Sequence, residues 1–389
     1  MVRQAGLRKK IAVVIPKYGL VGGGEQFALQ LTEKIAQNPR YDVHVFANKW
    51  KPASGNISFH FVPMVRFPRF LTTVSFAFFA NAAIARQNFD LIHTHDRIFH
   101  ADVFTMHGVP HRFWVREVRK KRMSLFDRAT AWVEQRLITD HRCRFLLPVS
   151  NLAMEKFSRE FAVNPNRVRV IHPGIEFSRF NLPNRAEKRE EIRKKFGIGG
   201  ADFLVLFVGM NFELKGLQTV ISALAKAKVK LPGKGMKLLV VGKGNQDKYR
   251  KIAADLGVDE DVVFAGVQTE GIEEIYAASE VCALLSGFDT FGMIVLEAMA
   301  ASLPVIISTQ VGAKDIVTDG EHGFIVAKDD AETVSTHLVS LCDEQRRTSM
   351  GRAARQRAAE HSWDEVAGKV VTIYEEILST GVGENLTAY

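Results

Sequence analysis

Cysteine is scarce in this sequence, and its few copies lie far apart. The 389 residues include three, Cys143, Cys282 and Cys342. This spacing provides neither a disulfide framework nor a set of cysteine ligands for zinc. The scarcity therefore argues against a disulfide-stapled domain and favours a reducing compartment.

Long apolar runs are also missing. The longest candidate, FLTTVSFAFFANAAI at 70–84, is interrupted by Thr, Ser and Asn, whereas a membrane-spanning helix needs about 20 consecutive apolar residues. The stretch IAVVI at 11–15 follows basic residues, but it is too short for the core of a signal peptide. We therefore interpret 11–15 as a first buried strand and expect a cytoplasmic protein.

Acidic residues are under-represented in the first half of the chain. Residues 1–180 contain 28 Lys and Arg against 13 Asp and Glu, whereas the remainder contains 24 against 30. Such an asymmetry indicates that the first half meets an anionic partner. The charge alone leaves open whether that partner is nucleic acid, a phospholipid surface or a phosphorylated substrate.

What the sequence does contain is a regular alternation of short apolar runs and helical patterns. The runs predicted as strands are 11–15, 43–46, 91–95, 102–106, 144–150 and 167–171, and then 203–209, 237–242, 262–266, 281–286, 304–308 and 323–326. Helical periodicity separates them, for example at 24–36, 216–228 and 272–279. Strands that are apolar on both faces predict parallel sheets covered by helices on each side. The fold class predicted is α/β, with doubly wound sheets.

The length predicts two such domains. The segment 172–198 begins with Pro-Gly and continues as a polar, charged stretch, which is typical of a linker. We predict a first domain at 1–175 and a second at 176–362, with an amphipathic C-terminal helix within 363–389 packing back on the first.

The most informative stretch is FDTFGMIVLEAMAASLPVI at 288–306. It follows a predicted strand, so the helix that starts near Phe291 presents its N-terminus, a natural phosphate site, at the edge of the sheet. Gly292 would let a phosphate approach the backbone, and Glu297 is placed to accept hydrogen bonds from a ribose diol. Asp289 could bind sugar hydroxyls in the same way. The alternative is an ordinary strand–loop–helix with solvated acids.

This stretch, continued by GAKDIVTDGEHGFIV, resembles the Glu-x7-Glu signature of the retaining GT-B glycosyltransferases of family 4. The resemblance implies two Rossmann-like domains facing across a cleft, with a nucleotide-sugar donor site in the second and an acceptor site in the first. It assigns the donor sugar to Asp289, the diphosphate to the backbone of Phe291, Gly292 and Met293, and the ribose to Glu297. This chain departs from the usual pattern at the first acid, where Asp289 replaces a glutamate.

Three further places carry the resemblance. The loop YGLVGGGEQF resembles the family's glycine-rich loop through Gly22 and Gly23, and RVRVIHPGIEFSRF resembles its interdomain turn. FVGMNFELKGLQTV resembles the phosphate clamp, although Lys215 is present without the expected arginine. On its own, Lys215 would be interpreted as a surface lysine.

Within the family, the first half is most similar to the bacterial lipopolysaccharide core glucosyltransferases, through PKYGLVGGGEQF, VHVFANKW and FDRATAWVEQ. The implied reaction transfers glucose or a similar hexose from a UDP-sugar to an anionic glycolipid such as the lipopolysaccharide inner core. The implied catalytic residues are Asp289, Lys215 and His107, and no metal or other cofactor is expected. His107 could instead be an ordinary loop histidine. We set aside metal binding by His93 and His95, and an Asp-x-Asp role for 259–261.

A basic segment at 111–144 holds ten Lys and Arg against four Asp and Glu, with aromatic residues interleaved. This composition predicts an interfacial segment on an anionic membrane surface. The residues assigned to membrane or acceptor binding are Arg112, Trp114, Arg119, Lys120, Lys121 and Arg122. A solvated basic helix pair is the alternative, and a nucleic-acid groove lacks any accompanying motif.

Three functions therefore remain open. The first is a hexosyltransferase acting at the inner face of the cell membrane. The second keeps the fold but uses a polyprenyl-linked or soluble glycan acceptor. The third is a non-catalytic membrane- or nucleic-acid-binding module, which leaves Asp289, Lys215 and Glu297 without a purpose. The base and sugar of the donor, the exact acceptor and the oligomeric state are not determined by the sequence.

Overall fold

The structure is a computed structural model that describes residues 8–20, 22–51 and 54–384. It consists of two compact units, Met1–Gly174 together with Trp363–Tyr389, and Ile175–Ser362. The predicted domain ends at 1–7 and 385–389 lie outside the described residues.

The first unit contains a six-stranded parallel sheet in the order β5-β3-β1-β6-β7-β8, and a separate two-residue ladder, β2-β4. Its strands are β1 Lys9–Val14, β2 Lys17–Tyr18, β3 Tyr41–Ala47, β4 Lys49–Trp50, β5 Ile57–Phe61, β6 Leu91–Thr94, β7 Val103–Met106 and β8 Phe145–Pro148. Its helices are α1 Gly23–Ala36, α2 Leu71–Ala85, α3 His111–Phe113, a π-helical turn η1 Trp114–Val118, α4 Leu125–Thr139, α5 Asn151–Glu160, the short turn η2 Pro165–Arg167 and α13 Trp363–Glu384.

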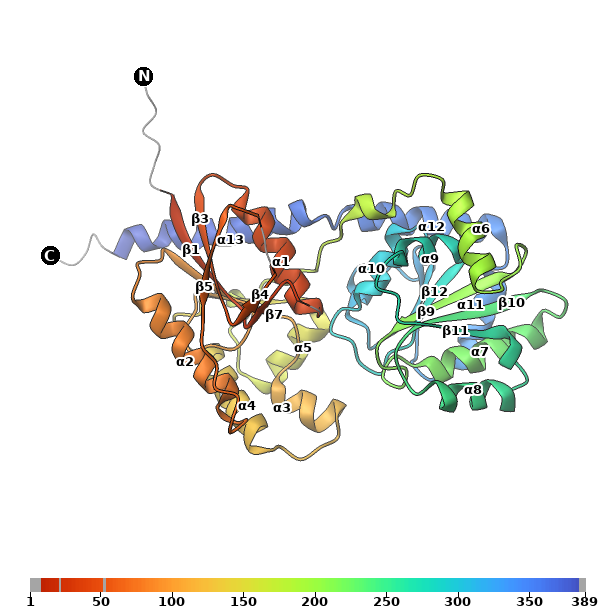
Figure 1. The fold of residues 1–389 in the computed structure, drawn as a ribbon, viewed down its shortest axis with the longest axis horizontal. Coiled ribbons are helices and arrows are strands. Elements are labelled where there is room, and N and C mark those ends of the chain that lie inside the picture. Colours follow the sequence, from red (N-terminus) through yellow and green to blue (C-terminus); the bar gives the residue numbers. More distant parts are fainter. Residues whose placement is uncertain (1–7, 21, 52–53, 385–389) are drawn as a thin grey trace, which may run out of the picture. The chain divides into compact units, whose positions relative to one another are not determined.

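Side chains of this sheet alternate between two covered faces. Ala12 and Val14 of β1 belong to the apolar cluster that contains residues of α2, α4 and α5. On the other face, His93 of β6 hydrogen-bonds Tyr374 of α13, and α13 packs against α1. Figure 1 shows α13, in blue, beside the strands of the first unit although it is the last helix of the chain. Helices on both faces of a parallel sheet define a doubly wound domain.

The second unit repeats this architecture with the strand order β11-β10-β9-β12-β13-β14, all parallel. Its strands are β9 Phe203–Gly209, β10 Met236–Gly242, β11 Val262–Gly266, β12 Val281–Leu284, β13 Val305–Ser308 and β14 Gly323–Val326. Its helices are α6 Arg185–Lys195, α7 Leu217–Lys230, α8 Gln246–Asp255, α9 Ile272–Ala278, α10 Met293–Ala300, α11 Ala331–Ser340 and α12 Glu344–Ala359, with short turns η3 Phe177–Phe180, η4 Asp259–Asp261 and η5 Gly312–Asp315.

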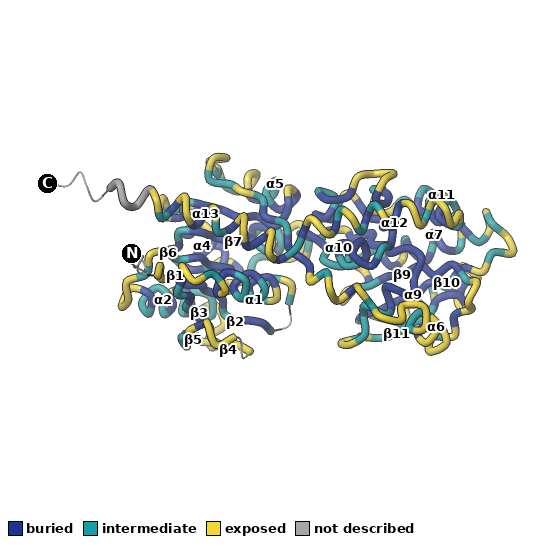
Figure 2. The backbone as a smooth tube through the Cα atoms, turned by 90° about the horizontal axis from the view of Figure 1, so that it is seen from above, coloured by how far each residue is buried: buried dark blue, intermediate teal, exposed yellow. Residues whose placement is uncertain are grey.

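The strands at the centre of the second sheet are buried on both faces. All seven residues of β10 except Lys237 are buried, and Figure 2 shows β9 and β10 in dark blue between helices with exposed outer faces. Val205 and Phe207 pack with α7, α8 and α11 in one apolar cluster. Burial from both sides explains why these strands are near-continuous apolar runs in the sequence.

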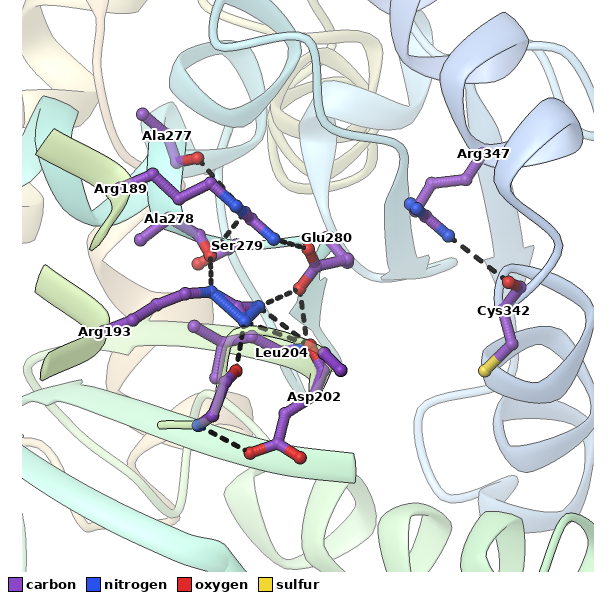
Figure 3. A network of polar contacts seen from close by, with 12 residues as sticks. Arg189, Arg193, Asp202, Leu204, Ala277, Ala278, Ser279, Glu280, Cys342 and Arg347 are labelled. Carbon is purple, nitrogen blue, oxygen red and sulfur yellow. Dashed lines mark hydrogen bonds and ion pairs between the residues drawn. The ribbon is translucent and has the colours of Figure 1, made fainter. Parts of the chain in front are cut away.

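A buried ionic network fastens α6 to this sheet (Figure 3). The Glu280 carboxylate, 8% exposed, accepts hydrogen bonds from Arg193 at 2.9 Å and from the backbone N–H of Leu204 at 2.7 Å, and it also pairs with Arg189. Arg193 further donates to the carbonyls of Gly199 and Asp202. Because Arg193 is 3% exposed, its charge is balanced almost entirely by Glu280.

Two details differ from the sequence-based prediction. Segment 167–171 was predicted as a strand and is not one, although Val168 forms an isolated bridge with Leu146. The neighbouring β8 contains Pro148, which has no N–H to donate to a further strand, so the ladder stops there. The edge strand β5 was missed because its alternation is short and partly polar.

The apolar stretch at 70–84 forms helix α2, which buries Phe76, Ala77, Ala80 and Ile84 in the first unit. None of the helices in the described part of the chain combines the length and the apolar character that crossing a bilayer requires.

Candidate functional site

The second sheet has a switch point between β9 and β12. These strands are neighbours, and the chain proceeds from them in opposite directions across the sheet, to β10 and to β13. Ligands of open parallel sheets bind where the carboxyl ends of two such strands diverge. The loop after β9 carries Lys215 and the loop after β12 carries Asp289.

Lys215 and Asp289 meet directly at this switch point. Their ammonium and carboxylate groups form an ion pair, and the two side chains are 24% and 14% exposed. A hydrogen bond from the N–H of Gly287 to the carbonyl of Leu214, at 2.8 Å, ties the two loops together. Lys215 is therefore held in place by Asp289 and is not a free surface lysine.

The loop between Asp289 and α10 is held to the segment that follows β13. The N–H of Asp289 donates to Gln310 O at 2.9 Å, and the N–H of Ala313 donates to Phe291 O at 2.7 Å. Gly292 caps α10 with φ +89°, and a Cβ there would lie 2.9 Å from the Val311 side chain. The glycine is thus required by the backbone conformation and by Val311, as well as by any phosphate that approaches.

Helix α10 begins at Met293, and the N-terminus of a helix attracts an anion, although the N–H of Val295 already donates to the carbonyl of Gly292 at 2.9 Å. Glu297 lies one turn further along, where its Oε2 accepts a hydrogen bond of 2.7 Å from the hydroxyl of Tyr276, which is fully buried. Burial raises the pKa of Glu297, while the Tyr276 hydroxyl and Arg179 lower it. Among the described residues no group donates to its Oε1, which leaves that oxygen for a ligand.

The glycine-rich loop of the first unit is built around Glu25 and His107. Gly22, with φ +148°, caps α1, and its Cβ would overlap the Glu25 carboxylate. Gly23 has no neighbour that would exclude a side chain, whereas a Cβ on Gly24 would lie 3.1 Å from the His107 ring. Gly24 was not singled out from the sequence, because its importance comes from a histidine 83 positions away. Val21 of this loop lies outside the described residues.

His107 lines a pocket of about 400 Å³ at the carboxyl ends of β1 and β6, together with Glu25, His95, Asp96 and Arg97. Its Nε2 lies 3.0 Å from Nδ1 of His95, and the two rings are stacked. The Nε2 atom of His95 is buried without a partner. An orphaned N–H costs more than an orphaned acceptor, so the proton belongs on His95 Nδ1, which donates to His107.

This tautomer leaves His107 with its proton on Nδ1, as a neutral hydrogen-bond donor. Burial lowers the pKa of His107 to about 3, so the ring stays neutral at physiological pH. His93 takes no part in the pocket, because its two ring nitrogens are occupied by Tyr374 at 2.6 Å and by Thr105 at 2.7 Å.

Within the described ranges, no group of three or more His, Cys, Asp or Glu side chains is arranged to hold a metal ion. Metal independence stays a prediction. In the 259–261 turn, Asp261 pairs with Lys228 and with Lys237 at 3.0 Å, which explains that acidic run as structural.

The basic segment folds as α3, η1 and α4. Arg119, Lys120, Lys121 and Arg122 are exposed, whereas Trp114 is half-buried and Arg112 donates to Gln135 at 3.2 Å. Arg119, Lys121 and Arg122 line a shallow pocket of about 520 Å³ with Arg69, Phe70 and Leu125. Leu125 and Phe70 are 68% and 38% exposed. The contribution of Arg69 and Phe70 was missed because Arg69 is 50 residues away from Arg119 in the sequence.

Two family models match the chain. The model described as Glycosyltransferase Family 4 covers residues 21–179, and the model described as Glycosyl transferases group 1 covers residues 188–357. The matches fall almost wholly within the first and the second unit, respectively.

Among proteins similar in sequence, a D-inositol 3-phosphate glycosyltransferase of Corynebacterium kroppenstedtii is 30% identical over 229 residues, which are 57% of this chain and 51% of that protein. The chain thus spans about half the length of this relative. An uncharacterized glycosyltransferase of Methanocaldococcus jannaschii is 24% identical over 94% of this chain and 98% of that protein.

Two solved structures share the whole fold. WaaG, described as a glycosyltransferase involved in lipopolysaccharide biosynthesis, has a TM-score of 0.76 at 22% identity and covers 94% of this chain and 99% of that one. Anabaena HepE, solved with UDP and glucose, has a TM-score of 0.71 at 16% identity and covers 95% and 100%. These likenesses confirm the predicted GT-B fold of two α/β units.

Proposed function

We propose that this chain is a retaining hexosyltransferase, because a glycosyltransferase family model matches each of its two units. It would transfer a hexose, in the first instance glucose, from a UDP-sugar to an anionic glycolipid such as the lipopolysaccharide inner core. The acceptor would be reached from the inner face of the cell membrane.

One observation supports this proposal most. Lys215, Asp289, the N-terminus of α10 and the open oxygen of Glu297 occur together at the switch point of one sheet. A diphosphate needs a cation and free N–H groups, and a ribose needs a carboxylate one turn away. A module that only binds membranes or nucleic acid would have no use for this combination.

The chemistry follows from charge. As the bond between sugar and diphosphate breaks, negative charge develops on the leaving phosphate, where Lys215 and the α10 N–H groups would stabilise it; each such contact contributes roughly 3 kcal/mol to lowering a barrier. Asp289, released from Lys215, would hold sugar hydroxyls. The acceptor hydroxyl would attack from the face of the leaving group and pass its proton to the phosphate, which retains the anomeric configuration.

His107 fits this scheme as a donor rather than as a base. Its protonated Nδ1 can donate to a sugar oxygen, and its low pKa keeps it from carrying a positive charge. No general base in the first unit is then required.

The comparisons point to two different kinds of acceptor. The fold of WaaG is in keeping with a glycolipid, while the relatives named D-inositol 3-phosphate glycosyltransferases point to a small phosphorylated acceptor. A polyprenyl-linked or soluble glycan is therefore kept as the alternative.

The test is a product assay with UDP-, GDP- and ADP-hexoses and the configuration of the product read by NMR. We expect UDP-glucose to be turned over, the anomer to be retained and EDTA to have no effect. Turnover of none of these donors, or an inverted product, would contradict the proposal.

A further inference from the structure

We propose a second binding site in the first unit, a pocket bounded by Lys17, Lys49 and Arg66 that takes a phosphorylated saccharide. It does not include Arg112, Trp114 or the basic residues 119–122, to which the sequence had assigned membrane or acceptor binding, although Phe126 of the basic segment lines it. The inference rests on the proposed function in one respect, because it supplies the acceptor for that transfer.

The pocket has a volume of about 460 Å³ and lies at the carboxyl ends of β1, β3 and β6. Met64, Phe76 and Phe126 give it an apolar wall, and Thr72, Thr73 and Asn48 add hydrogen-bonding groups. Sites of this size and mixed lining suit one small ligand. A pyranose presents an apolar face and a hydroxyl-rich edge, which matches such a wall.

The rim of the pocket carries an uncompensated positive charge. Lys17 and Lys49 are direct register partners in the two-residue β2-β4 ladder, so two like charges stand side by side. Among the described residues neither ammonium group has a hydrogen bond or an ion pair. Like charges at paired positions are destabilising, and a bound phosphate would relieve the repulsion.

Arg66 is fixed at the same rim. Its Nη2 donates to Asn48 Oδ1 at 3.2 Å, while Asn48 Nδ2 donates to the carbonyl of Val62 at 2.9 Å. The second bond sets the orientation of the amide, so its oxygen faces the guanidinium. Lys17, Lys49 and Arg66 therefore all line the opening of this pocket.

The acidic residue that lines the pocket is Asp96, and its carboxylate already accepts hydrogen bonds. It accepts from the N–H of Arg97 at 2.7 Å and from the Arg97 guanidinium at 3.3 Å. Arg97 is balanced in turn by Glu134, whose side chain is 1% exposed, at 2.8 Å. Lys17, Lys49, Arg66 and Arg97 thus carry four positive charges against two negative ones on Asp96 and Glu134, and a net positive charge remains for a ligand.

Asp96 and Arg97 also line the His107 pocket, as do Pro16 and Lys17. The two pockets are thus adjacent at the same edge of the sheet. A saccharide whose phosphate lies between Lys17, Lys49 and Arg66 can extend past Asp96 toward His107. This geometry points to an acceptor with its phosphate and its reacting hydroxyl on opposite sides of the sugar.

The experiment is methyl NMR of the full chain labelled with ¹³C at methionine methyl groups. Met64 lines the proposed pocket and Met293 begins α10, so one spectrum reports on both sites. The probes are glucose 6-phosphate, glucose, inorganic phosphate, UDP and vesicles containing phosphatidylinositol phosphate. The variant is Lys17→Gln/Lys49→Gln, and the control with the same net charge is Lys10→Gln/Arg86→Gln.

We expect glucose 6-phosphate or the lipid-borne form to shift Met64 in a saturable manner, and whichever acts at lower concentration identifies the source. Glucose and inorganic phosphate should bind at least 5-fold more weakly. The pocket variant should lose at least 10-fold in affinity, whereas the control should not change. The thermal stability of the pocket variant should not fall, since the substitution removes a repulsion.

The inference is overturned if Met64 does not respond, if glucose or phosphate alone binds equally well, or if the pocket variant binds like the control. A shift of Met293 by UDP in every variant reports separately on the donor site. Failure of the pocket is therefore distinguishable from failure of the proposed transferase.

Discussion

At the scale of single residues, Glu297 is the group whose environment most limits its chemistry. Burial raises its pKa, and the hydroxyl of Tyr276 partly opposes that rise. A ribose diol donates to the ionised carboxylate, so nucleotide affinity should decrease as the pH falls through this pKa.

Tyr276→Phe removes the donor that lowers the pKa of Glu297. The pKa should then rise further, and the acidic limb of UDP affinity should move to higher pH. Isothermal titration across pH 4.5–7.5 measures the shift. Tyr249→Phe, at a buried tyrosine on the opposite face of the sheet, is the matched control and should leave the acidic limb of UDP affinity unchanged. If UDP affinity had the same pH dependence in the parent and both variants, this role of Tyr276 would be contradicted.

His95 acts through His107 as a positioning residue. His95→Leu removes the donor that sets the His107 tautomer, and we expect kcat to fall roughly fivefold, since one net hydrogen bond contributes about 1 kcal/mol. His95→Asn, which keeps a donor, should restore most of the loss with an unchanged KM for the donor sugar. A purely structural role would show no such rescue.

At the scale of elements, the attachment of α6 depends on one carboxylate. Glu280→Ala leaves the guanidinium of Arg193 buried without its counter-charge, so the free energy of unfolding of the second unit should fall by roughly 3–5 kcal/mol. Glu332→Ala removes an exposed, solvent-screened partner of Lys226 and Lys230 and should lower the free energy of unfolding far less. Urea unfolding measures the loss of stability in both variants, and equal losses would refute this account of the network.

The elements also show what the sequence could and could not predict. Central strands were found because burial on both faces makes them continuous apolar runs, while β5 was missed because an edge strand needs no such run. The sequence suggests the residues of a donor motif one by one, and their roles stay a prediction. Their contacts could not be predicted, because the contact of Lys215 with Asp289 depends on the adjacency of β9 and β12, and the contact of Glu297 with Tyr276 depends on how α9 packs beside α10.

At the scale of the whole molecule, the unfolding of the two units can be followed by different spectroscopic signals. All four tryptophans, Trp50, Trp114, Trp132 and Trp363, belong to the first unit. Glu280→Ala should therefore shift the urea transition seen by far-UV circular dichroism and leave the tryptophan fluorescence transition in place. A coincident shift of both would mean that the units unfold together.

Membrane association is a second property of the whole molecule. Arg119, Lys120, Lys121 and Arg122 are exposed, and three of them line one pocket with Phe70 and Leu125. Their joint replacement by Gln should therefore reduce flotation with anionic vesicles and leave UDP-sugar hydrolysis unchanged. Binding of the parent should weaken with added salt. Unchanged flotation of the variant would place the membrane contact elsewhere.

The account depends most directly on a nucleotide held by α10 and Glu297. Isothermal titration of UDP into the parent, Glu297→Ala and the control Glu332→Ala measures this, with circular dichroism to verify that each protein is folded. We predict that Glu297→Ala shows no detectable binding at concentrations that saturate the parent and the control. Near-parent affinity in a folded Glu297→Ala protein would contradict the assignment of the donor site.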